Sequence, residues 1–275
     1  MKKYFFIILF ILVSEFLFSQ TVDTTVIKIK NRKIIVLNEK ISDIDDTMSI
    51  NFVDNINDVD AHWAGLGFGV NYFVNSALSS DLSKVNLQTG SGGQKYLEIL
   101  PEKSFEIQLN FAEKNFSIYQ DYISLTTGMG FQINNYRFRN NYRLDGSLPS
   151  ISANLDTVNN FSKSKLIVSY FSIPLLLEFQ FPNKTNPDNR IFLSMGAVAQ
   201  LRIGSHAKYV YDLNGSKTKD KNRDRFHLNP FLINYVAMIG YHDFSIYAKY
   251  SNSTVFVSNE GPKIYPISFG IILNI

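Results

Sequence analysis

The stretch Ile191-Phe-Leu-Ser-Met-Gly-Ala-Val-Ala-Gln-Leu-Arg-Ile203 decides the fold class of this chain. Its odd positions are all apolar, whereas most of its even positions are small or polar. Successive side chains of a β-strand point to opposite faces, so this period of two predicts a long strand with one apolar and one polar face. The final segment repeats the pattern, with apolar residues at every odd position from Tyr265 to Ile275 and with Ile272 as an exception on the other face.

Six further segments alternate in the same way, so the sequence predicts eight strands in all. These segments are residues 64–72, 105–111, 123–134, 167–180, 231–240 and 244–251. The connections between strands are alternately long and short, at 73–102, 113–118, 139–163, 181–190, 205–228, 241–243 and 253–262. Outer-membrane barrels alternate long outer loops with short periplasmic turns. We therefore expect an all-β fold, an eight-stranded antiparallel up-and-down transmembrane β-barrel with both termini in the periplasm.

A soluble barrel with a buried apolar face would show the same alternation. The composition of the polar face distinguishes the two, because a water-facing sheet surface is usually rich in Lys, Glu and Thr. Here the polar positions are mainly Gly, Ser, Asn and Gln, which suit the crowded lumen of a narrow membrane barrel. Pro174 removes one donor from its strand, so we expect a bulge or a missing rung at that position.

The N-terminal residues form a processing signal rather than part of the fold. Lys2 and Lys3 precede an apolar run from Tyr4 to Val13, which is too short for a stable spanning helix. We expect a signal peptide over residues 1–20 and a periplasmic lead-in over 21–61, with a possible hairpin followed by an acidic linker. The outer-membrane β-barrel would then occupy residues 62–275.

Overall composition excludes several classes of function. The net charge of +3 is too balanced for a nucleic-acid-binding domain, and the absence of cysteine excludes disulfides and thiolate chemistry. We expect no cofactor and no metal. The polar segment around Asp220, Asn222 and Asp224 resembles the start of a calcium loop, but Arg225 occupies the position that requires glycine.

Four charged residues fall on the polar face and are predicted to meet inside the barrel: Glu106, Glu178, Arg202 and Lys249. Isolated charges are costly in such a space, so they should be paired or hydrated. A salt-bridge network that plugs the lumen is the favoured interpretation. The alternative is the selectivity filter of a small pore, but eight strands leave little more room than side chains fill.

The connection after the fifth strand carries a cationic cluster on the predicted outer side. Its members are Lys217, Lys219, Lys221, Arg223 and Arg225. Lysine and arginine bind phosphate well, so these residues are candidates for contact with lipopolysaccharide. A solvated loop balanced by nearby aspartates is the alternative, and it is favoured.

No pattern predicts a catalytic site. Ser205 and His206 are adjacent, but neighbouring strand residues point to opposite faces and could not share a proton. The spacing of the four histidines matches no zinc motif. We therefore expect a protein that is not an enzyme, although a lipid-modifying barrel enzyme stays an alternative.

Three segments carry a resemblance to a known family. They are His62-Trp-Ala-Gly-Leu-Gly-Phe-Gly69, Ser172-Ile-Pro-Leu-Leu-Leu-Glu-Phe-Gln180 and Gly196-Ala-Val-Ala-Gln-Leu-Arg-Ile-Gly-Ser205. On the basis of these segments, residues 60–275 resemble the outer-membrane β-barrel family of Bacteroidota, which includes PorT-like proteins. Some PorT-like relatives are accessory to type IX protein secretion, so the resemblance implies a barrel that binds a partner, through its outer loops or its periplasmic segment. Outer-membrane lipid, lipopolysaccharide and a protein of the secretion machinery or cell surface are the expected partners, and nucleic acid is not.

Overall fold

The computed structural model describes residues 24–29, 32–37, 61–80, 82, 97–119, 122–181, 190–213 and 215–275. The predicted signal peptide and the acidic linker lie outside these described residues. The chain divides into two compact units, Met1–Asp58 and Val59–Ile275. In the first unit, β1 (Thr24–Ile29) pairs antiparallel with β2 (Arg32–Leu37).

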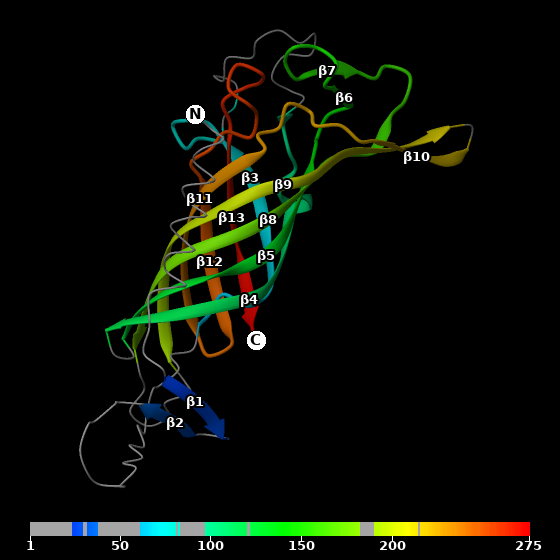
Figure 1. Cartoon of the computed structure of the whole chain (residues 1–275). Coiled ribbons are helices and arrows are strands. Elements are labelled where there is room, and N and C mark those ends of the chain that lie inside the picture. Colours follow the sequence, from blue (N-terminus) through cyan, green and yellow to red (C-terminus); the bar gives the residue numbers. More distant parts are fainter. Residues whose placement is uncertain are drawn as a thin grey trace, which may run out of the picture. The chain divides into compact units, whose positions relative to one another are not determined.

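Eight strands of the second unit close into a ring (Figure 1). In chain order these strands are β3 (Gly65–Val74), β4 (Phe105–Tyr119), β5 (Ile123–Arg137), β8 (Phe161–Phe181), β9 (Ile191–Leu213), β11 (Phe231–Tyr241), β12 (Phe244–Ser251) and β13 (Tyr265–Asn274). Every neighbouring pair is antiparallel, and β13 pairs with β3 to close the barrel. The predicted fold is therefore confirmed, because a ring of hydrogen-bonded strands leaves no open edge.

The outward positions of these strands form an apolar belt. Its members are about half-exposed and recur at every second residue: Leu66, Phe68, Ile107, Leu109, Phe131, Ile133, Ile173, Leu175, Met195, Leu201, Phe231, Ile239, Ile246, Phe269 and Ile271. The inward positions between them are buried, as the alternating burial of β8 and β11 shows. An apolar surface that surrounds a closed barrel is the kind that faces lipid.

Pro174 leaves the missing rung that the sequence predicts. Pairing of β5 with β8 stops at Thr127↔Leu175 and resumes at Gly130↔Ser172, in the same register on both sides. The hydroxyl of Thr127 donates to the carbonyl of Pro174 over 2.8 Å and replaces a backbone donor there. The strand therefore crosses its proline without a bulge on that side.

The two ends of the barrel differ in their connections. At one end, which we call the turn end, residues 120–122, 182–190 and 242–243 join the strands, and the chain terminus Ile275 lies there. At the other, the loop end, the connections are longer and add strands of their own. The added strands are β6 (Tyr142–Asp145), β7 (Ser152–Leu155) and β10 (Ser216–Asn222). A short 3₁₀ helix, Pro101–Lys103, lies at the same end.

The region expected to be a loop from 205 to 228 is largely strand. β9 continues to Leu213 and pairs with β10 as a hairpin that extends beyond the ring (Figure 1). The prediction of a loop here is wrong because β8 also begins early, at Phe161, and gives the extension of β9 a second neighbour. Among the described residues, no helix is long and apolar enough to cross a membrane.

Candidate functional site

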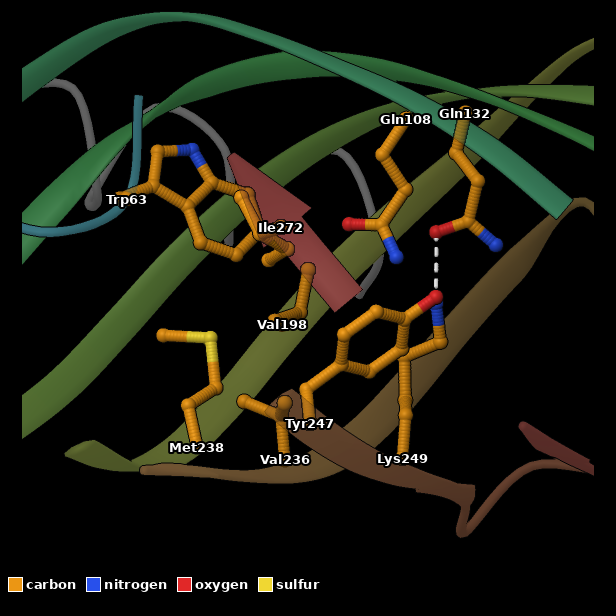
Figure 2. Close-up of a pocket in the computed structure, with 9 residues that line it drawn as sticks. All are labelled: Trp63, Gln108, Gln132, Val198, Val236, Met238, Tyr247, Lys249 and Ile272. Carbon is orange, nitrogen blue, oxygen red and sulfur yellow. Dashed lines mark hydrogen bonds between the residues drawn. The ribbon is translucent and has the colours of Figure 1, made fainter. Parts of the chain in front are cut away.

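A buried ion pair lies at the centre of the lumen. Lys249 Nζ of β12 is 2.9 and 3.0 Å from the two carboxylate oxygens of Glu106 on β4, and both residues are buried. The same ammonium donates to Gln132 Oε1 of β5 over 2.7 Å (Figure 2). Glu106 also accepts from Gln132, from Gln108 and from the hydroxyl of Tyr247. Both charges are therefore compensated inside the barrel, as burial of an ion pair requires.

The hydrogen bonds of this network continue across the lumen to further strands. Gln200 of β9 donates to Gln132 over 2.7 Å and to Ser172 of β8 over 3.2 Å, and it accepts from Asn234 of β11 over 2.9 Å. Side chains from six strands of the ring are thus linked directly. Two internal cavities lie beside the network, each of about 10 Å³, which is room for about one water.

Two glycines make space for Tyr247 to lie across the lumen. Gly69 of β3 and Gly270 of β13 face each other in the sheet. A Cβ on either would lie 2.3 or 2.7 Å from the Tyr247 hydroxyl oxygen. The ring can therefore reach Glu106 only because both positions lack a side chain.

The residues that precede β3 fill the lumen at the turn end. Glu113 accepts from the backbone N–H groups of Trp63 and Ala64, at 2.8 and 2.7 Å. The indole of Trp63 is buried in an apolar cluster inside the barrel, with Leu176, Val198, Val236, Met238, Tyr247 and Ile272. Ile272, which breaks the alternation in the sequence, therefore has a packing partner on the lumen side.

His62 also lies in this part of the lumen. We call His62 and Trp63, with the residues that they contact there, the plug. Its ring stacks on Phe192 at a centroid distance of 3.8 Å, and its Nδ1 lies 2.8 Å from Glu178. Ser194 donates to the other oxygen of Glu178 over 2.7 Å. Because the carboxylate stands between the serine and the histidine, the imidazole is not positioned to take the proton of the hydroxyl.

The loop end is closed by a hydrophobic core, which we call the cap core. It joins inward residues of the strand ends to residues of the long connections. Its members are Phe73, Leu97, Ile99, Tyr136, Phe138, Leu144, Ile151, Ala153, Leu166, Val168, Tyr170, Ala207, Tyr209, Phe226, Leu228, Leu232, Val255, Phe256 and Ile264. The connections at this end therefore fold onto the barrel instead of standing free of it.

Arg143 of β6 fastens the β6–β7 hairpin to the β9–β10 hairpin. Its guanidinium bonds to Asp156 over 2.9 Å and to Asp220 of β10, and it lies 5.0 Å from the ring centroid of Tyr209. Burial opposes ionisation of Asp156, but hydrogen bonds from Asn159 and Arg143 lower the pKa of this carboxyl to about 2. The ion pair between Arg143 and Asp156 therefore keeps both charges throughout the neutral and mildly acidic range.

His227 joins three connections of the cap. Its Nδ1 lies 2.8 Å from Glu260 and its Nε2 lies 3.1 Å from the carbonyl of Gly146. Both partners are acceptors, so both ring nitrogens act as donors only when the imidazole is charged. Burial works against that charge, but the bonds to Glu260 and Gly146 raise the pKa of His227 overall.

The four charged residues predicted to share the lumen lie at three levels. Glu106 and Lys249 meet at its centre, whereas Glu178 bonds to His62 near the turn end. Arg202 lies toward the loop end, where it donates to Ser205 over 3.0 Å and to the carbonyl of Arg225 over 3.3 Å. A single network of four charges is therefore not formed.

The predicted cationic cluster divides into two parts. Lys217, Lys219 and Lys221 lie on one face of β10, while Arg223 and Arg225 follow that strand. Asp220 lies between them in sequence but points to the opposite face, where it bonds to Arg143. One of the nearby aspartates expected to balance the cluster, Asp220, is thus engaged elsewhere.

Neither catalytic candidate forms an acid–base pair. Ser205 donates to the carbonyl of Asp224, and His206 belongs to the other face of β9. In the part of the chain that the structure describes, no three His, Cys, Asp or Glu residues are grouped as a metal site.

Sequence reasoning missed the plug and the cap core. The alternation continues into residues 136, 166, 168, 207 and 209, whose inward side chains are apolar rather than polar. This change of the inward face from polar to apolar is the signal that could have located the cap.

Comparison with known proteins identifies a family for most of the chain. Residues 57–253 match the family model described as "Outer membrane protein beta-barrel domain". No curated protein sequence matches the chain with significance. Among solved structures, a crystal structure of Ail, the attachment invasion locus protein of Yersinia pestis, is similar with 9% identity and a TM-score of 0.27, covering 77% of this chain and 99% of that one. A second crystal structure of Ail, in complex with the heparin analogue sucrose octasulfate, gives 10% identity, a TM-score of 0.28 and coverage of 77% and 96%.

Proposed function

The chain belongs to the outer membrane protein beta-barrel domain family, and from that premise we propose that it is a non-enzymatic barrel whose cap binds a partner protein. The cap core is the observation that supports this proposal. Connections that only join strands need no core, whereas a recognition surface benefits from loops that are ordered before binding. Outward from this core the cap exposes apolar side chains, among them Val158 at 89% and Leu155 at 55%.

We further propose that the loop end faces the outside of the cell, with the turn end and both termini in the periplasm. Long connections at one end and short turns at the other favour this orientation. Export through a signal peptide over residues 1–20 belongs to the same proposal.

The absence of cysteine makes the orientation directly testable. Val158→Cys in the cap should react with a membrane-impermeant maleimide on intact cells. Asp243→Cys, in the turn at the opposite end, should react only after the outer membrane is permeabilised. The reverse pattern would overturn the proposed orientation.

Partner binding is tested by photo-crosslinking in living cells. A photoreactive amino acid at position 155 or 158 should give a discrete protein adduct, and the same residue at position 243 is the matched control. The adduct should weaken when another exposed apolar residue of the same connection is changed, as in Leu148→Asp. An adduct that forms only from position 243 would place the partner on the other side and contradict the proposal.

The resemblance to PorT-like proteins makes a component of protein secretion the sharpest form of this partner. In that case the adduct should contain a secretion protein, and deletion of this chain should reduce the secreted fraction. Normal secretion in the deletion strain would exclude that form.

A passive pore is the second candidate, and the contents of the lumen disfavour it. The plug, the central network and the cap core follow one another along the barrel, and the two cavities described beside the network measure only about 10 Å³ each. We expect no steady conductance in planar bilayers. A lipid-modifying activity is the third candidate, and unchanged lipid A mass on deletion would count against it.

A further inference from the structure

Four cations form a straight row across four neighbouring strands at the loop end. The register pairs Arg137 of β5 with Lys165 of β8, Lys165 with Lys208 of β9, and Lys208 with Lys221 of β10. Residues that are direct cross-strand partners share one face of the sheet, about 5 Å apart. The four side chains therefore form one continuous row, which we call the cation row.

The cation row is on the outward face of the sheet. Leu166 and Ala207, which neighbour Lys165 and Lys208 in sequence, are buried on the inward side. In the pairing of β8 with β9 the register shifts between Ser169 and Tyr170, which pair with Gly204 and Arg202. Residues of β9 after this shift therefore alternate in the opposite sense to those before it, and Lys208 comes to the same face as Lys165. This irregularity aligns cations from strands whose simple alternation would have separated them.

The cation row lies just beyond the apolar belt. On β5, Arg137 follows the belt residue Ile133 by four positions on the same face, which is about 13 Å along the strand. Strand tilt of roughly 40° reduces this to about 10 Å of height. On β8, Lys165 lies six positions from Phe171 on the same face, and Phe171 pairs with Phe131 and Leu201 of the belt. The row thus reaches the depth at which lipid headgroups begin.

No acidic side chain compensates the row within the described part of the chain. None of its four members is in a salt bridge there, and Arg137 donates instead to the carbonyl of Ser162. Asp220 is bonded to Arg143 on the opposite face, while Asp212 pairs in register with Lys217, four residues further along β9 and β10 than the row.

Further positive charges reinforce the row instead of balancing it. Lys163 and Lys219 both pair with Val210, two residues further from the belt than the row. Like charges directly opposite one another destabilise a sheet, so a bound anion would relieve an existing cost.

We propose that the cation row binds the phosphate groups of lipopolysaccharide in the leaflet next to the loop end. Neighbouring members are close enough for one phosphate to contact two of them, and the row of four spans about 14 Å. A headgroup that carries a phosphate at each end can therefore engage both ends of the row. Arginine supplies a bidentate contact and the lysines supply point charges. The choice of lipopolysaccharide over phospholipid rests on the proposed orientation, whereas binding to phosphate does not.

The test compares two triple variants of the full-length protein in neutral detergent. Lys165→Gln/Lys208→Gln/Lys221→Gln removes three members of the row. Lys103→Gln/Lys114→Gln/Lys263→Gln removes the same charge from exposed lysines elsewhere and is the matched control. Both must show the heat-dependent gel shift of the wild type. The probe is fluorescent lipopolysaccharide, titrated by anisotropy, with its dephosphorylated form, phosphatidylglycerol and inorganic phosphate as competitors.

We expect the row variant to lose about ten-fold in affinity and the control to lose less than about two-fold. Wild-type binding should weaken with salt and should resist dephosphorylated lipid as a competitor. Equal affinities in the two variants would overturn the proposal. Competition by inorganic phosphate at the same concentration as lipopolysaccharide would overturn the lipid assignment, and equal competition by phosphatidylglycerol would overturn the choice of lipopolysaccharide. The cysteine-labelling result then shows separately whether the orientation is at fault.

Discussion

The centre of the lumen and the cap bury their residues in opposite ways. The lumen encloses Glu106 and Lys249 and compensates them with amides and hydroxyls from six strands. The cap, at the loop end of the same barrel, encloses Phe226, Phe256 and other apolar side chains. The first arrangement depends on every partner being present, since an unpaired buried charge is costly. The second depends on volume and can be opened locally without exposing a charge.

This comparison predicts the largest effect at the ion pair. Lys249→Met leaves Glu106 buried without its cation and should reduce the stability of the whole barrel by about 3–5 kcal/mol. The double variant Glu106→Gln/Lys249→Met should recover most of that loss. Denaturant unfolding in lipid vesicles measures it, with the single tryptophan, Trp63, as a probe inside the lumen. Equal destabilisation of the single and double variants would show that the pair contributes only by packing.

A cap variant should act locally. Phe256→Ala removes a fully buried ring and should cost the cap about 3 kcal/mol, while the unfolding midpoint reported by Trp63 stays near the wild type. Hydrogen exchange should accelerate in residues 143–155 and 252–264 but not in the strands below the cap. A matching fall in the midpoint of the barrel would mean that cap and lumen unfold together.

A smaller effect is expected where the backbone makes room for the network. Gly69→Ala places a methyl group against the Tyr247 hydroxyl and should cost about 1–3 kcal/mol by displacing it from Glu106. Gly204→Ala is the matched control, because an added Cβ there meets nothing within 4 Å. Similar stabilities for the two variants would show that Tyr247 can move without loss.

The smallest effect concerns pH and is confined to the cap. Since the pKa of His227 is raised in the folded protein, its contribution is fully present below the unfolded value of 6.5 and is lost as pH rises through the higher folded value. The pair with Glu260 is half-exposed, so we expect at most about 1 kcal/mol. Limited proteolysis should cut the cap faster at about pH 8.5 than at about pH 6. His227→Gln should remove this difference, and a persistent difference would assign it to another group.

The ring could be predicted from sequence because its signal is repeated. Alternation in Ile191–Ile203 and seven other segments determines which residues face lipid, and proline chemistry at Pro174 predicts the interrupted rung. The pairing of Glu106 with Lys249 could not be derived, since alternation gives the face of a residue but not its height in the barrel. Register between distant strands determines that height.

The cation row shows the same limit more sharply. Arg137, Lys165, Lys208 and Lys221 are separated by as many as 84 positions (221 − 137 = 84) and share no motif. Only the strand extensions of β8, β9 and β10, together with one register shift, bring them side by side. The sequence cluster from Lys217 to Arg225 pointed to the right end of the barrel but contained only one member of the row.

The hydrogen bonds that hold the plug lie beside the pairing of β13 with β3 that closes the ring, which constrains how the barrel forms. Asn274 donates to the carbonyl of His62 over 2.8 Å, and the N–H of Ile275 donates to the carbonyl of Ala64 over 3.2 Å. Asn274 of β13 and the residue after it thus secure the segment that leads into β3. Contacts of such sequence separation form slowly, because a long loop must close before they contribute. Until then β3 and β13 are open sheet edges able to pair with other chains. Both edges therefore stay open until β13 meets β3, and barrel closure and plugging become one event.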